Sequence, residues 1–193
     1  MRLTGGEHAG RRLRVPADGL RPTQDKVRAA LFSSLAAQVP GARVLDLFAG
    51  TGAMGLEAWS RDAAWVEWIE NAKAPLGALR DNLRTLGVPS EAGSVIDADV
   101  FQRLGRPCPG AGFDLVIADP PYALARAEGW LEIVAKRLAT NGWIQPGGIF
   151  VFEAEGKEAP PDLPGWRLAG DKRYGSTRLL IWVREEMDPD AEG

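Results

Sequence analysis

The chain has 193 residues, of which 45% are hydrophobic, and a net charge of −3. It is therefore long enough to bury one sizeable core and too acidic to bind nucleic acid indiscriminately. A single cysteine, Cys108, and a single histidine, His8, argue against a disulfide, a metal site and a Ser-His-Asp triad. With no apolar run longer than a strand and no signal-like start, we expect a cytoplasmic protein with no membrane partner and no metal.

The amino-terminal residues differ from the rest in charge. Residues 1–28 hold seven Lys or Arg and three Asp or Glu, a net charge of +4 that leaves −7 for the remaining chain. Glycines separate two short alternating stretches in residues 1–15, which predicts a hairpin-like arm. A basic arm on an acidic body suggests a phosphate-contacting surface, although the same charges would also suit a solvated face.

Residues 42–58 carry a short apolar run, a glycine-rich turn and a helix-forming segment. Gly50 and Gly52 allow a sharp turn and close approach to a ligand, as in cofactor cradles at the end of a parallel strand. The spacing to Gly55 also matches the dinucleotide fingerprint, which alone does not identify the cofactor. Asp46, a carboxylate within the apolar strand, would either hold a cationic or amine-bearing ligand or order the loop through backbone amides.

Strands and helices then alternate, which predicts a mostly parallel sheet covered on both faces with ligands at the carboxyl ends of its strands. Asp46, Glu70, Asp99 and Asp119 each follow or end such a strand, so we expect them at one edge. Glu70 suits two ribose hydroxyls, whereas Asp99 would accept from an adenine amine or cap a helix. After a helix that starts near Thr23, the patterns predict helices to about residue 60, over 72–86 and over 126–139. They predict strands over 65–69, 94–96, 114–118, 166–172 and 177–184, and a strand that ends at residue 153 after a turn at 146–148.

The strand over 114–118 runs into Asp119-Pro120-Pro121-Tyr122. The two prolines cannot continue a sheet ladder, so the chain leaves the sheet stiffly with fixed carbonyls. Asp119 and the Pro120 carbonyl offer two acceptors, and Tyr122 offers an aromatic face. This arrangement suits a planar group that bears an amine with two hydrogens.

At these residues the chain resembles the Class I S-adenosylmethionine-dependent methyltransferases, and among them the bacterial small-subunit ribosomal RNA (guanine-N2) methyltransferase family. Nearly the whole chain takes part, since further matching motifs lie at residues 5–13, 20–28, 69–70, 81–83 and 174–179. The resemblance implies an α/β, Rossmann-like fold with a mostly parallel seven-stranded sheet, helices on both faces and a small amino-terminal β-hairpin arm. It also implies methyl transfer from S-adenosylmethionine to the 2-amino group of a guanine in small-subunit ribosomal RNA.

The resemblance assigns roles to individual residues of this chain. Catalysis falls to Asp119, Pro120, Pro121 and Tyr122, and cofactor binding to Asp46, Phe48, Gly50, Thr51, Gly52, Glu70, Asn71, Asp99 and Val100. RNA contact falls to Arg2, Arg11, Arg12, Arg14, Arg21, Thr23 and Arg28. The chain departs from the family pattern at Ala29, Ser33 and Ala72, where the family usually has Glu, Asn and Asp.

We expect three parts: a basic hairpin arm at residues 1–22, a methyltransferase domain at 23–184 and an acidic, disordered tail at 185–193. We also expect a monomer, with ribosomal RNA, in a partly assembled small subunit or alone, as its partner. The same motifs would serve methylation of an adenine or cytosine amine in DNA or another RNA. An NAD-dependent oxidoreductase would use only the glycine turn, and a non-catalytic ribosome-assembly module would use only the basic arm.

Overall fold

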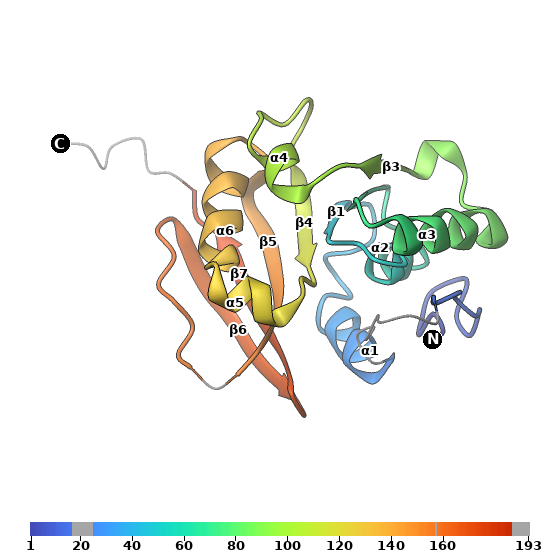
Figure 1. Cartoon of the computed structure of the whole chain (residues 1–193), viewed down its shortest axis with the longest axis horizontal. Coiled ribbons are helices and arrows are strands. Elements are labelled where there is room, and N and C mark those ends of the chain that lie inside the picture. The colour runs from blue at the N-terminus through green and yellow to red at the C-terminus, as the bar shows by residue number, and fades with distance from the viewer. Residues whose placement is uncertain (17–24, 157, 187–193) are drawn as a thin grey trace.

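A seven-stranded sheet runs through the middle of the protein in this computed structural model (Figure 1). The structure describes residues 1–16, 25–156 and 158–186. The strands are β1 (Arg43–Leu47), β2 (Trp65–Glu70), β3 (Gly93–Asp97), β4 (Phe113–Ala118), β5 (Ile144–Glu155), β6 (Trp166–Tyr174) and β7 (Thr177–Arg184). The helices are α1 (Asp25–Ser34), α2 (Ala53–Trp59), α3 (Lys73–Leu86), α4 (Val100–Leu104), α5 (Tyr122–Ala127) and α6 (Trp130–Thr140), with a short 3₁₀ turn, η1 (Ser90–Ala92).

The strand order is β3-β2-β1-β4-β5-β7-β6. β1 to β5 are all parallel to one another, whereas β7 pairs antiparallel with both β5 and β6. The prediction of a mostly parallel seven-stranded α/β sheet is therefore confirmed. Because the strand order reverses between β1 and β4, the ends of these two strands open a crevice of the kind in which α/β proteins bind ligands.

Successive strand residues point to opposite faces of the sheet and so feed two separate cores. On one face, Val44 and Leu115 pack with apolar residues of α1, α2 and α3. On the other face, Leu45 and Val116 pack with those of α4 and α6. The central strands can therefore be continuously apolar, as the sequence is, because helices cover both faces.

The amino-terminal arm differs from the prediction. Its described part makes one isolated antiparallel bridge, between Arg2 and Arg12, and no hairpin of regular strands. Two side chains explain this, because Leu3 and Leu13 are buried in the core with α1 and α2. Packing of those leucines holds the segment against the domain, and a two-stranded ribbon alone would be only marginally stable.

The helix predicted over 126–139 is also wrong in its extent. The chain instead forms α5 directly after the two prolines and α6 from Trp130, separated by Gly129 with a φ of 63°. Glycine adopts this left-handed conformation without penalty, which ends one helix and redirects the next. The sequence predicted a helix after Asp99 only as one of two alternatives and without bounds, because α4, with five residues, is too short to show a periodic pattern.

Two of the predicted RNA contacts, Arg21 and Thr23, lie outside the described residues, as does most of the predicted tail, residues 187–193. Within the described ranges, no helix is long and apolar enough to cross a membrane.

Candidate active site

A cavity of about 740 Å³ opens at the carboxyl ends of the parallel strands. Asp46, Glu70, Asp99 and Asp119 all line it, as expected from their places at four neighbouring strand ends. Of the residues predicted to be catalytic or to bind the cofactor, only Gly52 is not among the lining residues. The topology thus gathers residues that are more than 70 positions apart in the chain.

Asp46 ties the end of β1 to the start of α2. Its Oδ2 accepts a hydrogen bond of 2.8 Å from the backbone N–H of Gly55, and the residue is only 1% exposed. Burial, together with the nearby carboxylates of Asp119 and Glu70, raises the pKa of Asp46 well above its usual value, although the Gly55 hydrogen bond opposes the shift. A cation in the cavity would relieve this cost, so the loop-ordering role and the ligand-holding role are compatible.

Two glycines, Gly52 at the end of the turn and Gly55 in α2, leave no room for a side chain. Gly52 has a φ of 80°, and a Cβ atom there would lie 2.2 Å from Cδ1 of Leu79. At Gly55 a Cβ atom would lie 2.2 Å from the indole nitrogen of Trp68. Both glycines are therefore required by close packing of α2 against β2 and α3, which explains why Gly52 shapes the cavity without lining it.

Glu70, at the end of β2, also holds the glycine-rich turn in place. One carboxylate oxygen accepts the N–H of Gly50 at 2.8 Å, and the other accepts the N–H groups of Asn71 and Ala72 at 2.9 and 2.7 Å. A carboxylate has about four acceptor sites, so Glu70 can still accept from a ligand hydroxyl. Ala72, one of the departures from the family pattern, lines the cavity with its small side chain.

An aromatic wall, formed by Phe48, Phe101 and Trp130, bounds another part of the cavity. The Phe48 and Trp130 rings stack with centroids 5.3 Å apart, and Phe101 meets both edge-on. Phe48 has a φ of 56°, which is uncommon for a phenylalanine, so the turn holds its ring in a specific direction. Sequence reasoning included Phe48 but missed the other two rings, whose only signal was their position directly after Val100 and Gly129.

Asp99 acts as a helix cap. Its Oδ1 accepts the N–H of Gln102 at 2.9 Å, at the start of α4. The cap places Val100 and Phe101 at the cavity wall. Of the two roles considered for Asp99, the helix cap is therefore present in the structure, while a contact to a ligand amine stays a prediction.

The segment Asp119 to Tyr122 enters the cavity from the end of β4. The carbonyl of Pro121 accepts the N–H of Ala125 and is occupied by α5. Among the described residues nothing donates to the carbonyl of Pro120, so this carbonyl is available as an acceptor beside the Asp119 carboxylate. No cluster of His, Cys, Asp or Glu in the same described ranges could hold a metal ion.

The Tyr122 ring is fixed by its hydroxyl group. That hydroxyl donates to Oε1 of Glu153, a buried residue of β5, and lies 3.4 Å from Oγ1 of Thr177 on β7. Burial and the hydrogen bond to Glu153 raise the pKa of Tyr122 above its usual value. The hydroxyl is therefore a held donor and not a base. Sequence reasoning missed Glu153, which gave no signal within an otherwise apolar strand.

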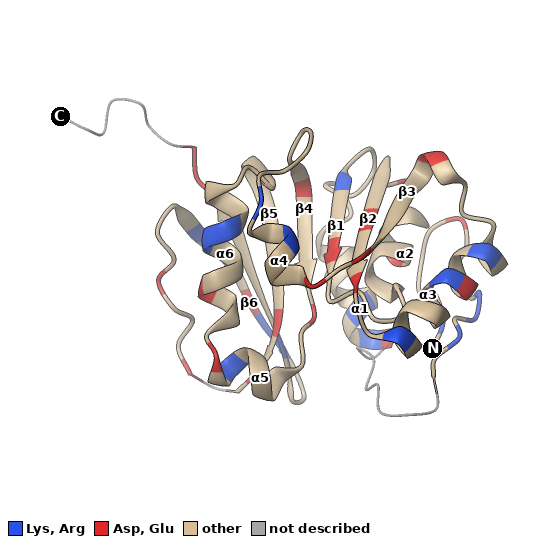
Figure 2. Ribbon diagram, turned by 45° about the horizontal axis from the view of Figure 1, so that its top comes forward, with Lys and Arg blue, Asp and Glu red and all other residues tan. Residues whose placement is uncertain are grey.

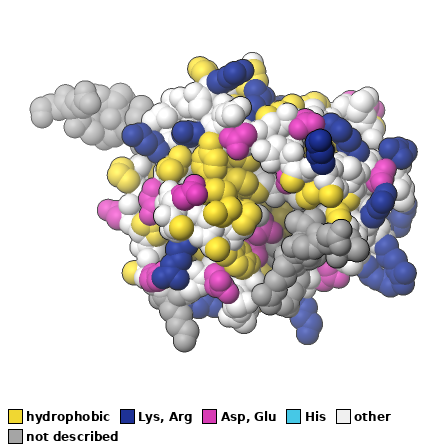
Figure 3. Space-filling view, in the orientation of Figure 1, with side chains coloured by type: hydrophobic (Ala, Val, Ile, Leu, Met, Phe, Trp, Pro, Cys, Tyr) yellow, Lys and Arg dark blue, Asp and Glu magenta, His cyan; other side chains and the backbone are white. Residues whose placement is uncertain are grey.

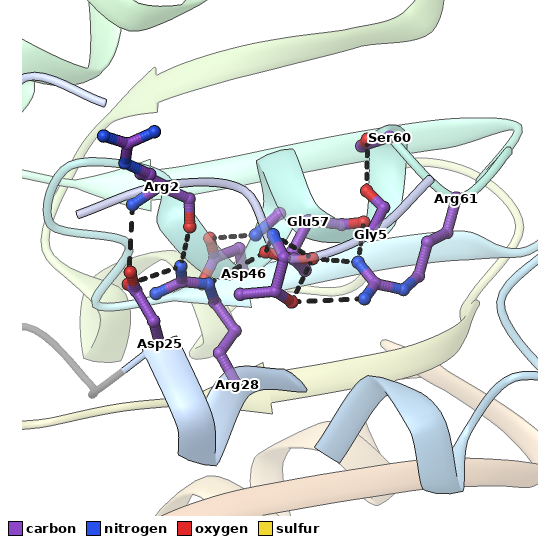
Figure 4. Close-up of polar contacts among 10 residues, drawn as sticks. Arg2, Gly5, Asp25, Arg28, Asp46, Glu57, Ser60 and Arg61 are labelled. Carbon is purple, nitrogen blue, oxygen red and sulfur yellow. Dashed lines mark hydrogen bonds and ion pairs between the residues drawn. The ribbon is translucent and has the colours of Figure 1, made fainter. Parts of the chain in front are cut away.

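The basic residues of the arm fall into two groups. Arg2, Arg11, Arg12 and Arg14 are exposed. The predicted RNA contact at Arg28 is wrong in this structure, because its side chain is 0% exposed and lies 2.9 Å from a carboxylate oxygen of Glu57 (Figure 4).

Glu57, also 0% exposed, is the centre of a buried network on α2 (Figure 4). It accepts from the Thr4 hydroxyl at 2.7 Å and from the Thr4 backbone N–H at 2.9 Å, and it pairs with Arg61. Arg28 also donates to Asp25 and to the carbonyl of Arg2. Arg28 is therefore a structural anchor that fastens the arm to the helix after the glycine turn.

Two further arginines extend the exposed basic surface. Arg80 and Arg84 lie one helical turn apart on α3, with side chains 54% and 77% exposed. α3 lies beside the amino-terminal arm (Figure 2), and Arg14 of the arm pairs with Asp81 of α3. Lys and Arg side chains gather at this end of the molecule (Figure 3). The arm and α3 together thus form a basic surface that the sequence suggested only for the arm.

The strand order, the glycine turn and the acidic strand ends define the class: this is a methyltransferase fold. The solved structure of an Escherichia coli methyltransferase matches with a TM-score of 0.84 and 37% identity, over 96% of this chain and 98% of that one. A Haemophilus influenzae methylase matches with a TM-score of 0.79 and 32% identity, over 96% and 98%.

The relatives in sequence are more specific. The chain is 37% identical to ribosomal RNA small subunit methyltransferase D of E. coli strain K12, over 98% of this chain and 94% of the relative. It is 36% identical to the H. influenzae protein of the same name, over 94% and 93%. The chain belongs to the family described as conserved hypothetical protein 95, whose model matches residues 1–183.

Proposed function

We propose that this chain transfers a methyl group from S-adenosylmethionine to the 2-amino group of a guanine in small-subunit ribosomal RNA. The observation that carries the proposal is one cavity that joins the glycine turn and Glu70 to Asp119 and Tyr122. The names of the relatives, ribosomal RNA small subunit methyltransferase D, support the same class of substrate.

The cavity fits S-adenosylmethionine in shape and charge. Glu70 retains acceptor capacity for a ribose hydroxyl, and the aromatic wall offers apolar surface to an adenine ring. Asp46 is buried, so ionising its carboxylate alone is costly. The positive sulfonium or amino group of the cofactor would offset that cost. The residues that would hold the cofactor are Asp46, Phe48, Gly50, Thr51, Glu70, Asn71, Asp99 and Val100.

The bound cofactor supplies an activated methyl group, and the chain's residues prepare the acceptor. A guanine 2-amino group is a poor nucleophile because its lone pair is delocalised into the ring. Asp119 and the Pro120 carbonyl accept its two hydrogens, which directs the lone pair outward, and Asp119 can take the released proton. Tyr122, held by Glu153, presents its ring to a base that has left its stack. Alignment of this kind contributes up to about 7–11 kcal/mol in well-oriented reactions.

The basic surface on the arm and α3 supports binding of RNA phosphates next to the site. We place the arm at residues 1–22 in that role and the methyltransferase domain at 23–184. The acidic remainder of the chain favours a small-subunit particle over bare RNA, because other contacts must then supplement a short basic surface. We infer that the protein acts as a monomer in the cytoplasm.

The test is transfer of a labelled methyl group from S-adenosylmethionine to unmodified small-subunit particles and to free ribosomal RNA, with nucleoside analysis of the product. The expected product is N2-methylguanosine, and a methylated adenine or cytosine, or transfer to DNA, would contradict the proposal. Asp119→Ala should abolish transfer and retain cofactor binding measured by calorimetry. Equal loss of both would contradict the role given to Asp119.

A further inference from the structure

Glu155 differs from the other carboxylates of the cavity. Asp46, Glu70 and Asp99 each accept at least one backbone N–H. Glu128 accepts the indole N–H of Trp130 at 2.9 Å. Glu155 also lines the cavity, is exposed, and forms no side-chain hydrogen bond or ion pair within the described part of the chain. It is therefore an acidic acceptor that the fold itself does not use.

Glu155 lies on the side of the cavity where the base that accepts the methyl group would bind. It ends β5, which runs parallel to β4, the strand that leads to Asp119. Side chains two residues apart on a strand share a face, so Glu155 follows Glu153, whose carboxylate holds Tyr122, by about 7 Å. In the sheet Glu155 is also opposite Thr177, which contacts the same tyrosine hydroxyl.

A carboxylate at the position of Glu155 would favour the hydrogen-bonding edge of guanine over that of adenine or cytosine. In guanine the 2-amino group is adjacent to N1–H, so two neighbouring groups are donors. In adenine and cytosine the ring nitrogen next to the amine has a lone pair and is an acceptor. An ionised carboxylate can only accept, so it attracts the guanine edge and repels the other two.

We propose that Glu155 selects guanine by accepting its N1–H while Asp119 and the Pro120 carbonyl accept the hydrogens of the 2-amino group. This inference rests on the proposed function and adds the determinant of base choice. A hydrogen bond to a charged group contributes about 1.5–3 kcal/mol, which corresponds to about 10- to 150-fold in kcat/KM.

The test changes the proposed hydrogen bond from both sides, at N1 of the base and at the side chain of residue Glu155. Small-subunit particles are reconstituted with either guanosine or 2,6-diaminopurine riboside at the nucleotide that the wild-type chain methylates. The second base keeps the 2-amino group but has an acceptor at N1. The wild type should prefer guanosine, and Glu155→Gln should lose about 10- to 150-fold on guanosine and gain on diaminopurine, because its amide can donate to N1.

Two further variants make the result specific. Glu155→Asp keeps a carboxylate and should keep the preference for guanosine. Glu158→Gln is the matched control, since Glu158 is exposed, pairs with Arg126 and does not line the cavity, and it should behave as the wild type. Cofactor affinity and melting temperature should be unchanged in all three variants.

The outcomes separate this inference from the function on which it rests. An active Glu155→Gln variant that keeps the wild-type preference between the two bases would overturn the role of Glu155. An equal loss on both bases would also overturn it, because a merely structural role predicts no change in preference. If the wild-type chain does not methylate guanosine in particles at all, the proposed function itself is wrong.

Discussion

Glu57→Gln tests whether the buried network in Figure 4 holds the arm and the glycine turn together. Glutamine has nearly the same shape as glutamate but no charge, so the fully buried Arg28 guanidinium would lose its buried carboxylate partner while its contacts to Asp25 and the Arg2 carbonyl remain. Removing one partner of a buried ion pair costs about 3–5 kcal/mol. For a chain of this size, each kcal/mol lowers the melting temperature by about 2–4 °C, so we expect a fall of about 6–20 °C.

The assay is thermal and urea unfolding at pH 7, with Arg28→Met and the double variant completing a cycle. The double variant should be more stable than the sum of the single losses predicts, because the charge and its partner are removed together. A loss below about 1 kcal/mol for Glu57→Gln, or additive losses in the cycle, would refute the reasoning.

The same network predicts a pH dependence. Burial alone would raise the pKa of Glu57, but hydrogen bonds from Thr4, Arg61 and Arg28 outweigh it and leave the pKa below its ordinary 4.5. The folded state thus binds fewer protons than the unfolded state as pH falls through this range. The stabilisation is present above about pH 4.5 and is lost as pH falls through the folded pKa, so wild type and Glu57→Gln should converge in acid.

Three further predictions concern the cavity and the basic surface. Since the folded pKa of Asp46 is raised, its ionisation costs stability as pH rises from about 3.8 through that pKa; Asp46→Asn should therefore melt higher than wild type at pH 7 and bind cofactor more weakly. Tyr122→Phe and Glu153→Gln should each lower kcat at least about tenfold with unchanged cofactor affinity, and the double variant should be no worse than either alone. Replacing Arg11 and Arg12 together by alanine should weaken binding to small-subunit particles. The slope of log affinity against log salt concentration should become shallower by up to about two units.

Each of these predictions has its own contradicting result. Cofactor affinity unchanged in Asp46→Asn would remove that carboxylate from the cofactor site. If the double variant of Tyr122 and Glu153 lost kcat by the product of the two single losses, the two residues would act independently. An unchanged salt slope after the arginine replacements would make the arm a solvated face, with Arg167→Ala, an exposed change on β6, as the matched control.

The sequence determined those features of the fold that depend on local pattern. Apolar runs separated by helix-forming segments dictate a parallel sheet covered on both faces, and that topology brings Asp46, Glu70 and Asp119 to one edge whatever the details of packing. The glycine turn was also predictable from the sequence, because Gly50 and Gly52 indicated a sharp turn and both have a positive φ in the structure. The close contact that requires a glycine at Gly55 is visible only in the structure.

Tertiary structure decided what depends on neighbours that are distant in the chain. Arg28 is basic in sequence, yet Glu57, 29 residues later, makes it a buried anchor. Glu153 and Glu155 are two acids of one strand, but the first meets Tyr122 and the second faces the cavity. Charge is a property of a residue, whereas burial and pairing are properties of its three-dimensional surroundings, and in this protein the surroundings make Arg28 a buried anchor and leave Arg11 and Arg12 exposed.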